Sequence, residues 1–83
     1  MDDRIKRLIF RSNHRGMKEM DFLVGRFAVA KAAELSSDQL DRLETLLEEI
    51  DNDLMTWLLN KEPVPPHLDS DVFRMIQAFN EIG

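Results

Sequence analysis

Apolar residues along the 83-residue chain recur three or four positions apart, the spacing of one face of an α-helix. Five helical segments follow from this pattern. The first covers about residues 3–10, with Asp2 and Asp3 at its positive amino end. The second covers about residues 16–33. The apolar stripe of this second helix consists of Met17, Met20, Leu23, Val24 and Phe27.

The third segment carries the clearest start signal. Ser36 followed by Gln39 is typical of a capping box, and Leu35 and Leu40 have the spacing of a hydrophobic staple. The apolar positions of this helix are Leu40, Leu43, Leu46, Leu47 and Ile50.

Two further helices complete the pattern. A short fourth helix is predicted over residues 52–60, because the prolines of EPVPP (62–66) end it. A fifth starts near Leu68 and runs close to the end of the chain. Together the segments predict a compact all-α bundle of five helices in a single domain, residues 1–83. The expected core includes Leu43, Leu47, Trp57, Ile76 and Phe79.

Composition narrows the function classes. The chain has no cysteine, which excludes disulfides, thiolate metal sites and thiol nucleophiles. No apolar run approaches the roughly 20 residues that span a membrane. The first ten residues, MDDRIKRLIF, resemble neither a signal peptide nor a transit peptide, so a cytoplasmic protein is expected.

Charge is unevenly distributed along the chain. Residues 1–26 hold seven Lys/Arg against four Asp/Glu, net +3, whereas residues 27–83 hold four against twelve, net −8. These values agree with the overall charge of −5. Nucleic-acid-binding domains are usually basic overall. This chain is acidic overall with a basic first third, and that distribution of charge favours a protein or cofactor partner.

The stretch HRGMKEMDF, residues 14–22, departs from the pattern of a plain amphipathic helix. Glycine inside a helix costs about 1 kcal/mol relative to alanine. On a helical wheel the polar face carries one stripe, Arg15, Glu19, Phe22 and Arg26. One interpretation is a solvated face with an Arg15–Glu19 pair at i, i+4. The other interpretation is a docking surface, because Arg15, the glycine backbone at Gly16 and the exposed ring of Phe22 would lie together.

Three segments in order resemble one protein family. RSNHRGMKEMDFLVGRF is similar to the Arg-Gly-x-x-Glu signature of the succinate dehydrogenase flavinylation factors, the SdhE-type assembly factors of bacteria and their mitochondrial relatives. DNDLMTWLLN resembles the Asp-Leu-x-x-Trp helix of this family, and EPVPP resembles its link to the last helix. The resemblance covers nearly the whole chain.

The resemblance implies a non-enzymatic, chaperone-like assembly factor with the family's five-helix fold. Such a factor binds the flavoprotein subunit of succinate dehydrogenase, and often that of fumarate reductase, and promotes covalent attachment of FAD to it. FAD would be handled on the partner, with no cofactor held stably by this chain, which is expected to be monomeric when free. The family's signature carries over as Arg15, Gly16, Glu19 and Asp21. We expect the interface with the partner to include Arg11, His14 and Phe22 as well.

Three other functions remain open at this point, one of them a small enzyme. The basic first third could serve a helix-turn-helix nucleic-acid-binding module or a general protein-interaction module. The second helix, however, mixes acids with its bases. Nucleic-acid binding would fall steeply with salt and needs several Lys/Arg on one recognition helix. A metal site built from His14, Glu19, Asp21 and His67 fits no standard ligand spacing, so none is expected.

Overall fold

The computed structural model describes residues 2–82, so the two ends of the predicted domain, residues 1 and 83, lie outside the described part of the chain. The elements in order are α1 (Asp3–Asn13), α2 (Lys18–Met20), the π-helical turn η1 (Asp21–Gly25), α3 (Arg26–Lys31), the 3₁₀ turn η2 (Ala32–Glu34), α4 (Ser37–Leu47), α5 (Asp51–Leu58), the 3₁₀ turn η3 (Pro66–Leu68) and α6 (Asp71–Phe79). Since α2, η1, α3 and η2 follow one another without a break, residues 18–34 form one helical rod. The described residues thus form five helices and no strand, which confirms the predicted all-α, five-helix fold.

The predicted start of α4 is confirmed in detail. The Ser36 hydroxyl accepts from the Gln39 backbone N–H at 3.2 Å, and the Gln39 side-chain oxygen accepts from the Ser36 N–H at 3.0 Å. Two of the donors that a helix leaves free at its amino end are thereby satisfied. α1 and α6 begin in a similar way, with side chains of Asp2 and Ser70 accepting from backbone N–H groups of the first turn.

The last two helices end in the same backbone motif. Asn60 follows α5 with a φ of 60°, and the Lys61 N–H donates to the Thr56 carbonyl at 2.9 Å. Glu81 follows α6 with a φ of 59°, and the Ile82 N–H donates to the Gln77 carbonyl at 2.9 Å. A left-handed residue followed by such a bond defines the Schellman motif, which satisfies carbonyls at the helix end.

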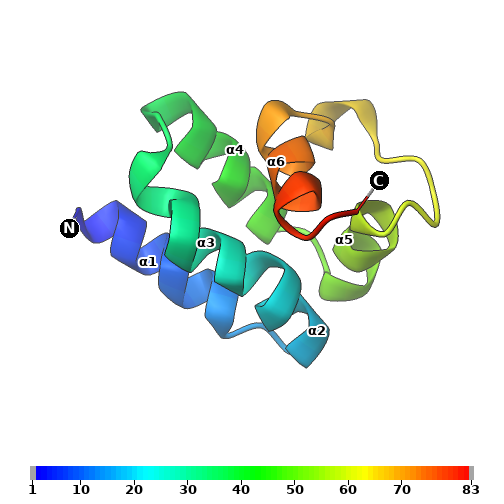
Figure 1. The fold of residues 1–83 in the computed structure, drawn as a ribbon, viewed down its shortest axis with the longest axis horizontal. Helices are drawn as coiled ribbons and strands as arrows, with labels where there is room; N and C mark the ends of the chain where they lie inside the picture. Colours follow the sequence, from blue (N-terminus) through cyan, green and yellow to red (C-terminus); the bar gives the residue numbers. More distant parts are fainter. Residues whose placement is uncertain (1, 83) are drawn as a thin grey trace.

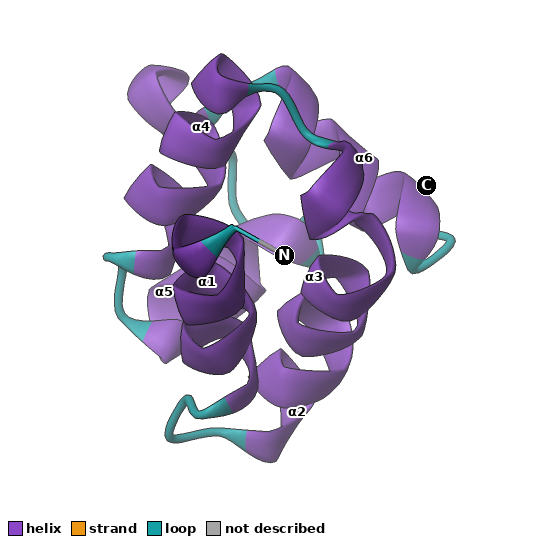
Figure 2. Ribbon diagram, turned by 90° about the vertical axis from the view of Figure 1, so that its left-hand side faces the viewer, coloured by secondary structure: helices purple, strands orange, loops and turns teal. Residues whose placement is uncertain are grey.

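One apolar core joins all five helices. α1 and the rod of residues 18–34 lie side by side, joined by a short loop, and α4 and α6 pack together beside them (Figures 1 and 2). Of the expected core residues, Leu43, Leu47 and Ile76 are buried, whereas Trp57 and Phe79 are partly exposed and pack against the core from its edge. The described helices include none long and apolar enough to cross a membrane.

The second helix differs from its prediction in two ways. It begins at Lys18 rather than near residue 16, because Met17 is extended, with φ −109° and ψ 129°. It also contains the π turn η1, which has more residues per turn than an α-helix, so positions no longer advance by 100° per residue. The apolar stripe still faces inward and is buried from Met20 to Phe27. Positions on the polar face are displaced from where the wheel put them.

The π turn η1 packs against α1. Gly25 is buried in η1, and a Cβ at this position would lie 2.4 Å from Asn13 Oδ1 and 3.0 Å from the Ser12 carbonyl oxygen. The Asn13 side chain donates to the Ile9 carbonyl at 2.8 Å and to the Gly25 carbonyl at 3.4 Å. A side chain here would displace Asn13 from these hydrogen bonds and crowd the Ser12 carbonyl, so packing within the chain favours glycine at this position.

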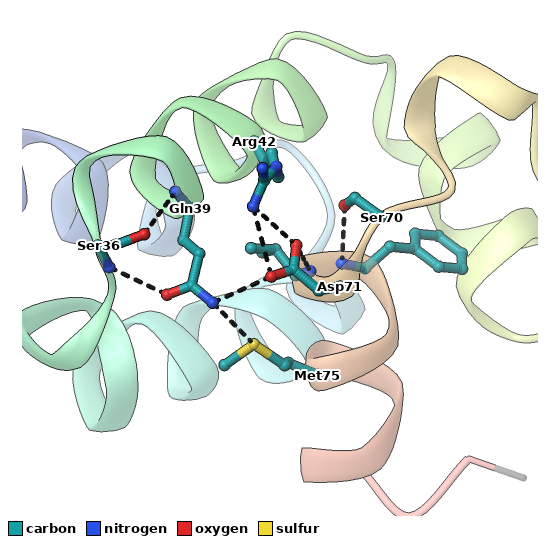
Figure 3. Close-up of polar contacts among 8 residues, drawn as sticks. Ser36, Gln39, Arg42, Ser70, Asp71 and Met75 are labelled. Carbon is teal, nitrogen blue, oxygen red and sulfur yellow. Dashed lines mark hydrogen bonds and ion pairs between the residues drawn. The ribbon is translucent and has the colours of Figure 1, made fainter.

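A polar cluster joins the start of α4 to the start of α6 (Figure 3). Gln39 donates to Asp71 Oδ2 at 3.0 Å while its oxygen serves the capping box, and Arg42 donates to Asp71 Oδ1 at 3.2 Å. The Gln39 hydrogen bond lowers the pKa of Asp71, with smaller contributions in the same direction from the Val72 N–H and from Arg42. Desolvation opposes these contributions.

We expect Asp71 to stabilise the fold most above the ordinary carboxyl pKa of about 4. Because its pKa is lower in the folded state, this contribution is present above that value and is lost as the pH falls through the folded-state pKa. The difference in unfolding free energy between the parent and Asp71→Asn, measured by urea unfolding at several pH values, should shrink as the pH falls. The control is Asp38→Asn, whose carboxylate forms no hydrogen bond or ion pair within residues 2–82. A difference for Asp71→Asn that stayed constant with pH would contradict the assignment.

Candidate functional site

The first four residues of the segment singled out in the sequence, 14–17, form the loop between α1 and α2. Residues 14–17 lie outside both helices, and the loop is seen as the sharp connection between α1 and α2 in Figure 2. Gly16 therefore does not occupy a helix interior, and the expected helix-propensity cost does not apply to it. The loop adjoins the turn between α4 and α5, residues 48–50, because residues of both segments line one hollow.

Arg15 points into the protein from this loop. Its Nε donates to Asp51 Oδ1, its Nη1 to the Leu47 carbonyl at 2.8 Å and its Nη2 to the Glu49 carbonyl at 2.6 Å. The side chain is only 10% exposed. The guanidinium thus satisfies carbonyls at the carboxyl end of α4, which would otherwise lack partners, and pairs with a carboxylate at the start of α5.

Asp51 is the partner that the sequence analysis missed. It is the first residue of α5, where a carboxylate also suits the positive end of the helix. Its Oδ1 accepts from Arg15, and its Oδ2 accepts from the Met17 N–H at 3.2 Å. Thirty-six positions separate Asp51 from Arg15, so no local spacing rule along the chain pairs the two residues.

Glu19 and Asp21, the two acids of the signature segment, have different surroundings. Asp21 Oδ1 accepts from the Arg15 backbone N–H at 3.2 Å, so it helps to hold the loop. Glu19 is exposed, and its side chain forms no hydrogen bond or ion pair with another residue of the described chain. The Arg15–Glu19 pair of the solvated-face interpretation is therefore not formed, because Arg15 is turned toward Asp51.

Gly16 itself is exposed at the loop surface and has no positive φ. A Cβ on Gly16 would lie 3.6 Å from Asp51 Oδ2, an ordinary van der Waals contact. In contrast to Gly25, Gly16 is thus not favoured as glycine by packing or by backbone conformation within the described chain.

An open hollow of about 430 Å³ lies beside the loop. This hollow is called the Gly16 hollow below. It is lined by Phe10, Arg11, His14, Arg15, Gly16, Glu49, Ile50 and Asp51. Four of the seven expected interface residues, Arg11, His14, Arg15 and Gly16, are therefore brought together here.

Two large apolar side chains at the Gly16 hollow are exposed. Phe10 is 60% exposed and Ile50 is 69% exposed. The His14 ring stacks on Phe10 with 3.8 Å between centroids, and its Nδ1 lies 2.8 Å from the Phe10 carbonyl oxygen. Ile50 had been placed on the buried stripe of the third helix, which is wrong because α4 ends at Leu47. In the first helix Ile5, Leu8 and Ile9 form an apolar stripe at i, i+3, i+4 spacing, and Phe10 lies off it, which is the signal by which its exposure could have been predicted.

Phe22 lies apart from this hollow. It is 56% exposed, and the Arg26 guanidinium carbon sits 4.5 Å from its ring centroid. Both residues line a separate hollow of about 310 Å³ with Phe79, Asn80 and Glu81, which shares no lining residue with the Gly16 hollow. The predicted stripe Arg15–Glu19–Phe22–Arg26 is therefore not one surface, since Arg15 lies outside the helix and turns inward.

The basic character of the first third is concentrated on α1. Lys6, Arg7 and Arg11 are exposed, and their side chains pair with no acid of the described chain. They flank Phe10, forming a basic surface around an exposed ring that continues into the Gly16 hollow through Arg11. Among residues 2–82, no group of three or more His, Asp or Glu side chains is arranged to hold a metal ion.

The chain matches the family described as "Flavinator of succinate dehydrogenase" over residues 6–80. It is 36% identical over 72 residues to "Succinate dehydrogenase assembly factor 2, mitochondrial" of Dictyostelium discoideum, covering 87% of this chain and 51% of that protein. It is 38% identical over 71 residues to "FAD assembly factor SdhE" of Acetobacter pasteurianus, covering 86% and 65%. The Kluyveromyces lactis assembly factor 2 is 32% identical over 85 aligned positions, covering 98% and 52%.

The chain thus spans about half to two thirds of the length of these relatives. The family match nevertheless extends from α1 through α6 and includes the Arg15–Gly16 loop. The chain therefore belongs to the family of flavinators of succinate dehydrogenase.

Proposed function

We propose that this chain binds the flavoprotein subunit of succinate dehydrogenase and promotes covalent attachment of FAD to that subunit. The observation that carries the proposal is the family match over residues 6–80. The names of the relatives support it, since they are assembly factors of succinate dehydrogenase or of FAD. The fumarate reductase flavoprotein is a second candidate partner of the same chemistry.

The contact surface in this proposal centres on the Gly16 hollow. Exposed aromatic and aliphatic side chains beside arginine are typical of the energetically dominant part of a protein interface. Phe10, Ile50 and Arg11 provide this combination, and Gly16 leaves the backbone between them accessible. We propose that Arg11, His14, Gly16 and Glu19 contact the partner, whose matching surface would be apolar at its centre and acidic at the edge facing α1.

The chain's own part in the reaction is to hold the partner in a competent geometry. It contains no cysteine or tyrosine, and the nucleophile and the flavin would both belong to the partner. Restricting a partner to the reactive arrangement can lower a barrier by several kcal/mol without any chemical group from the helper. In this proposal the chain acts as a monomer in the cytoplasm and keeps no FAD of its own.

We expect Arg11→Glu to weaken binding of the flavoprotein subunit by about tenfold, since reversing a charge at an interface edge places like charges together. Isothermal titration calorimetry with the purified subunit measures this, at low and at moderate salt. The control is Lys61→Glu, the same reversal of charge at an exposed lysine that lines neither hollow. Equal losses in both variants would mean that diffuse charge governs binding, and the proposed contact surface would be wrong.

A further inference from the structure

We propose that Asp51 is a positioning residue of the Gly16 hollow, and that Arg15 acts through Asp51 instead of contacting the partner itself. This inference rests on the proposed function, because its main effect is read as binding of the flavoprotein subunit. It separates the two charged residues of the Arg-Gly-x-x-Glu motif into one that faces inward, Arg15, and one that faces outward, Glu19.

The contacts of Arg15 leave little of it for a partner. Its side chain is 10% exposed, and donors on all three guanidinium nitrogens are engaged, with Asp51 and with the carbonyls of Leu47 and Glu49. A partner group would have to displace bonds that satisfy the end of α4, leaving buried carbonyls unpaired. Glu19, by contrast, is exposed and has no polar side-chain contact in the described chain.

Asp51 fixes the loop on both sides of the glycine. One carboxylate oxygen holds the Arg15 side chain and the other holds the Met17 N–H, so the residues before and after Gly16 are tied to the same group. These three residues, Arg15, Met17 and Asp51, are called the carboxylate clamp below.

The same group also fixes the opposite wall of the hollow. Ile50 lies between Glu49 and Asp51 in the chain. Arg15 donates to the Glu49 carbonyl and to the Asp51 carboxylate, so the residues on both sides of Ile50 are held. The exposed Ile50 side chain and the bare Gly16 backbone therefore face the hollow from segments that the carboxylate clamp joins. Loss of the clamp would free both walls, so that binding would have to order them again, at a cost in affinity.

The test is a double-mutant cycle with Arg15→Lys and Asp51→Asn, measured as Kd for the purified flavoprotein subunit. Lysine keeps the charge but loses the fork of donors, and asparagine keeps the size but has one acceptor oxygen for two donors. Each single change should raise Kd about tenfold, the effect of losing a hydrogen bond to a charged group. The double variant should be about as weak as either single variant, because both break the same clamp. Multiplied losses in the double variant would show that Arg15 has a contact of its own with the partner, and would overturn the proposal.

A second measurement tests the clamp in the free protein. Hydrogen exchange by NMR should be slow at the Met17 amide and at Arg15 Nε in the parent, and at least one of them should exchange about tenfold faster in Asp51→Asn, while amides of the core keep their rates. Unchanged exchange at both sites would overturn the clamp. Thermal unfolding of each variant identifies any loss of binding that comes from unfolding.

The matched control is Asp53→Asn, in the same first turn of α5, whose carboxylate is exposed and forms no bond within the described chain. Its Kd should equal that of the parent. If the parent itself does not bind the subunit, the proposed function fails. The hydrogen-exchange rates at the Met17 amide and at Arg15 Nε then still test whether Asp51 holds the loop. If the parent binds and Asp51→Asn binds equally well, this inference fails and the proposed function stands.

Discussion

Replacing Phe27 with alanine should unfold much of the protein under conditions in which the parent is folded. Phe27 is 1% exposed, lies on α3 and meets the Phe79 ring edge-on, with 5.8 Å between centroids. Removing a buried phenylalanine side chain costs about 3–5 kcal/mol. A domain near 80 residues has only about 3–5 kcal/mol from its core, so this single change rivals the whole stability.

Urea unfolding followed by circular dichroism measures the effect. The control is Val29→Ala on the same helix, which removes apolar atoms from a side chain that is 64% exposed. The urea concentration at the unfolding midpoint of that variant should equal that of the parent or be slightly higher, because alanine favours helix. A Phe27→Ala protein with the midpoint of the parent would mean that Phe27 is not part of the core.

The second large effect is expected at Gly16, on binding instead of stability. Gly16→Leu should fold normally, because a Cβ there meets only Asp51 Oδ2, at 3.6 Å, and no positive φ is required. If the partner approaches the bare backbone beside Phe10 and Ile50, a leucine side chain would keep the surfaces apart. We expect at least about a hundredfold loss of affinity, comparable to removing an interface hot spot.

Calorimetry with the flavoprotein subunit and thermal unfolding of the same samples separate the two effects. Gly16→Ala is the graded control: it should be as stable as the parent or gain up to about 1 kcal/mol, since alanine reduces the freedom of the unfolded chain. Its affinity should fall between those of the parent and Gly16→Leu. A stable Gly16→Leu protein with parental affinity would contradict close approach at this position, and an unfolded one would mean that the loop needs glycine for its own conformation.

The helices could be predicted from the sequence because their signals are local. The capping box of Ser36 and Gln39 lies within four residues, and the apolar stripes set which faces are buried. The boundaries of the second helix could not, because they depend on tertiary contacts. The π turn occurs where Gly25 packs against Asn13, and Met17 is extended where its N–H meets Asp51.

The candidate site was predicted in part, for a similar reason. Arg11, His14 and Gly16 lie at the surface of one hollow, as a local motif can suggest. The partner of Arg15 could not be found by spacing, since the i, i+4 rule favours Glu19, whereas the contact in the structure is with Asp51 at the start of α5. Ile50 is exposed because α4 ends at Leu47. The position of Ile50 on a helical wheel does not show where the helix ends.

The most direct test of the central claim is reconstitution of flavin attachment. The purified flavoprotein subunit without flavin is incubated with FAD in the presence or absence of this chain, and covalent flavin is measured by fluorescence after a denaturing gel. We expect the chain to raise the covalent signal strongly, Lys61→Glu to act like the parent, and Gly16→Leu to give no more signal than FAD alone. Equal covalent flavin with and without the parent chain would contradict the proposed function.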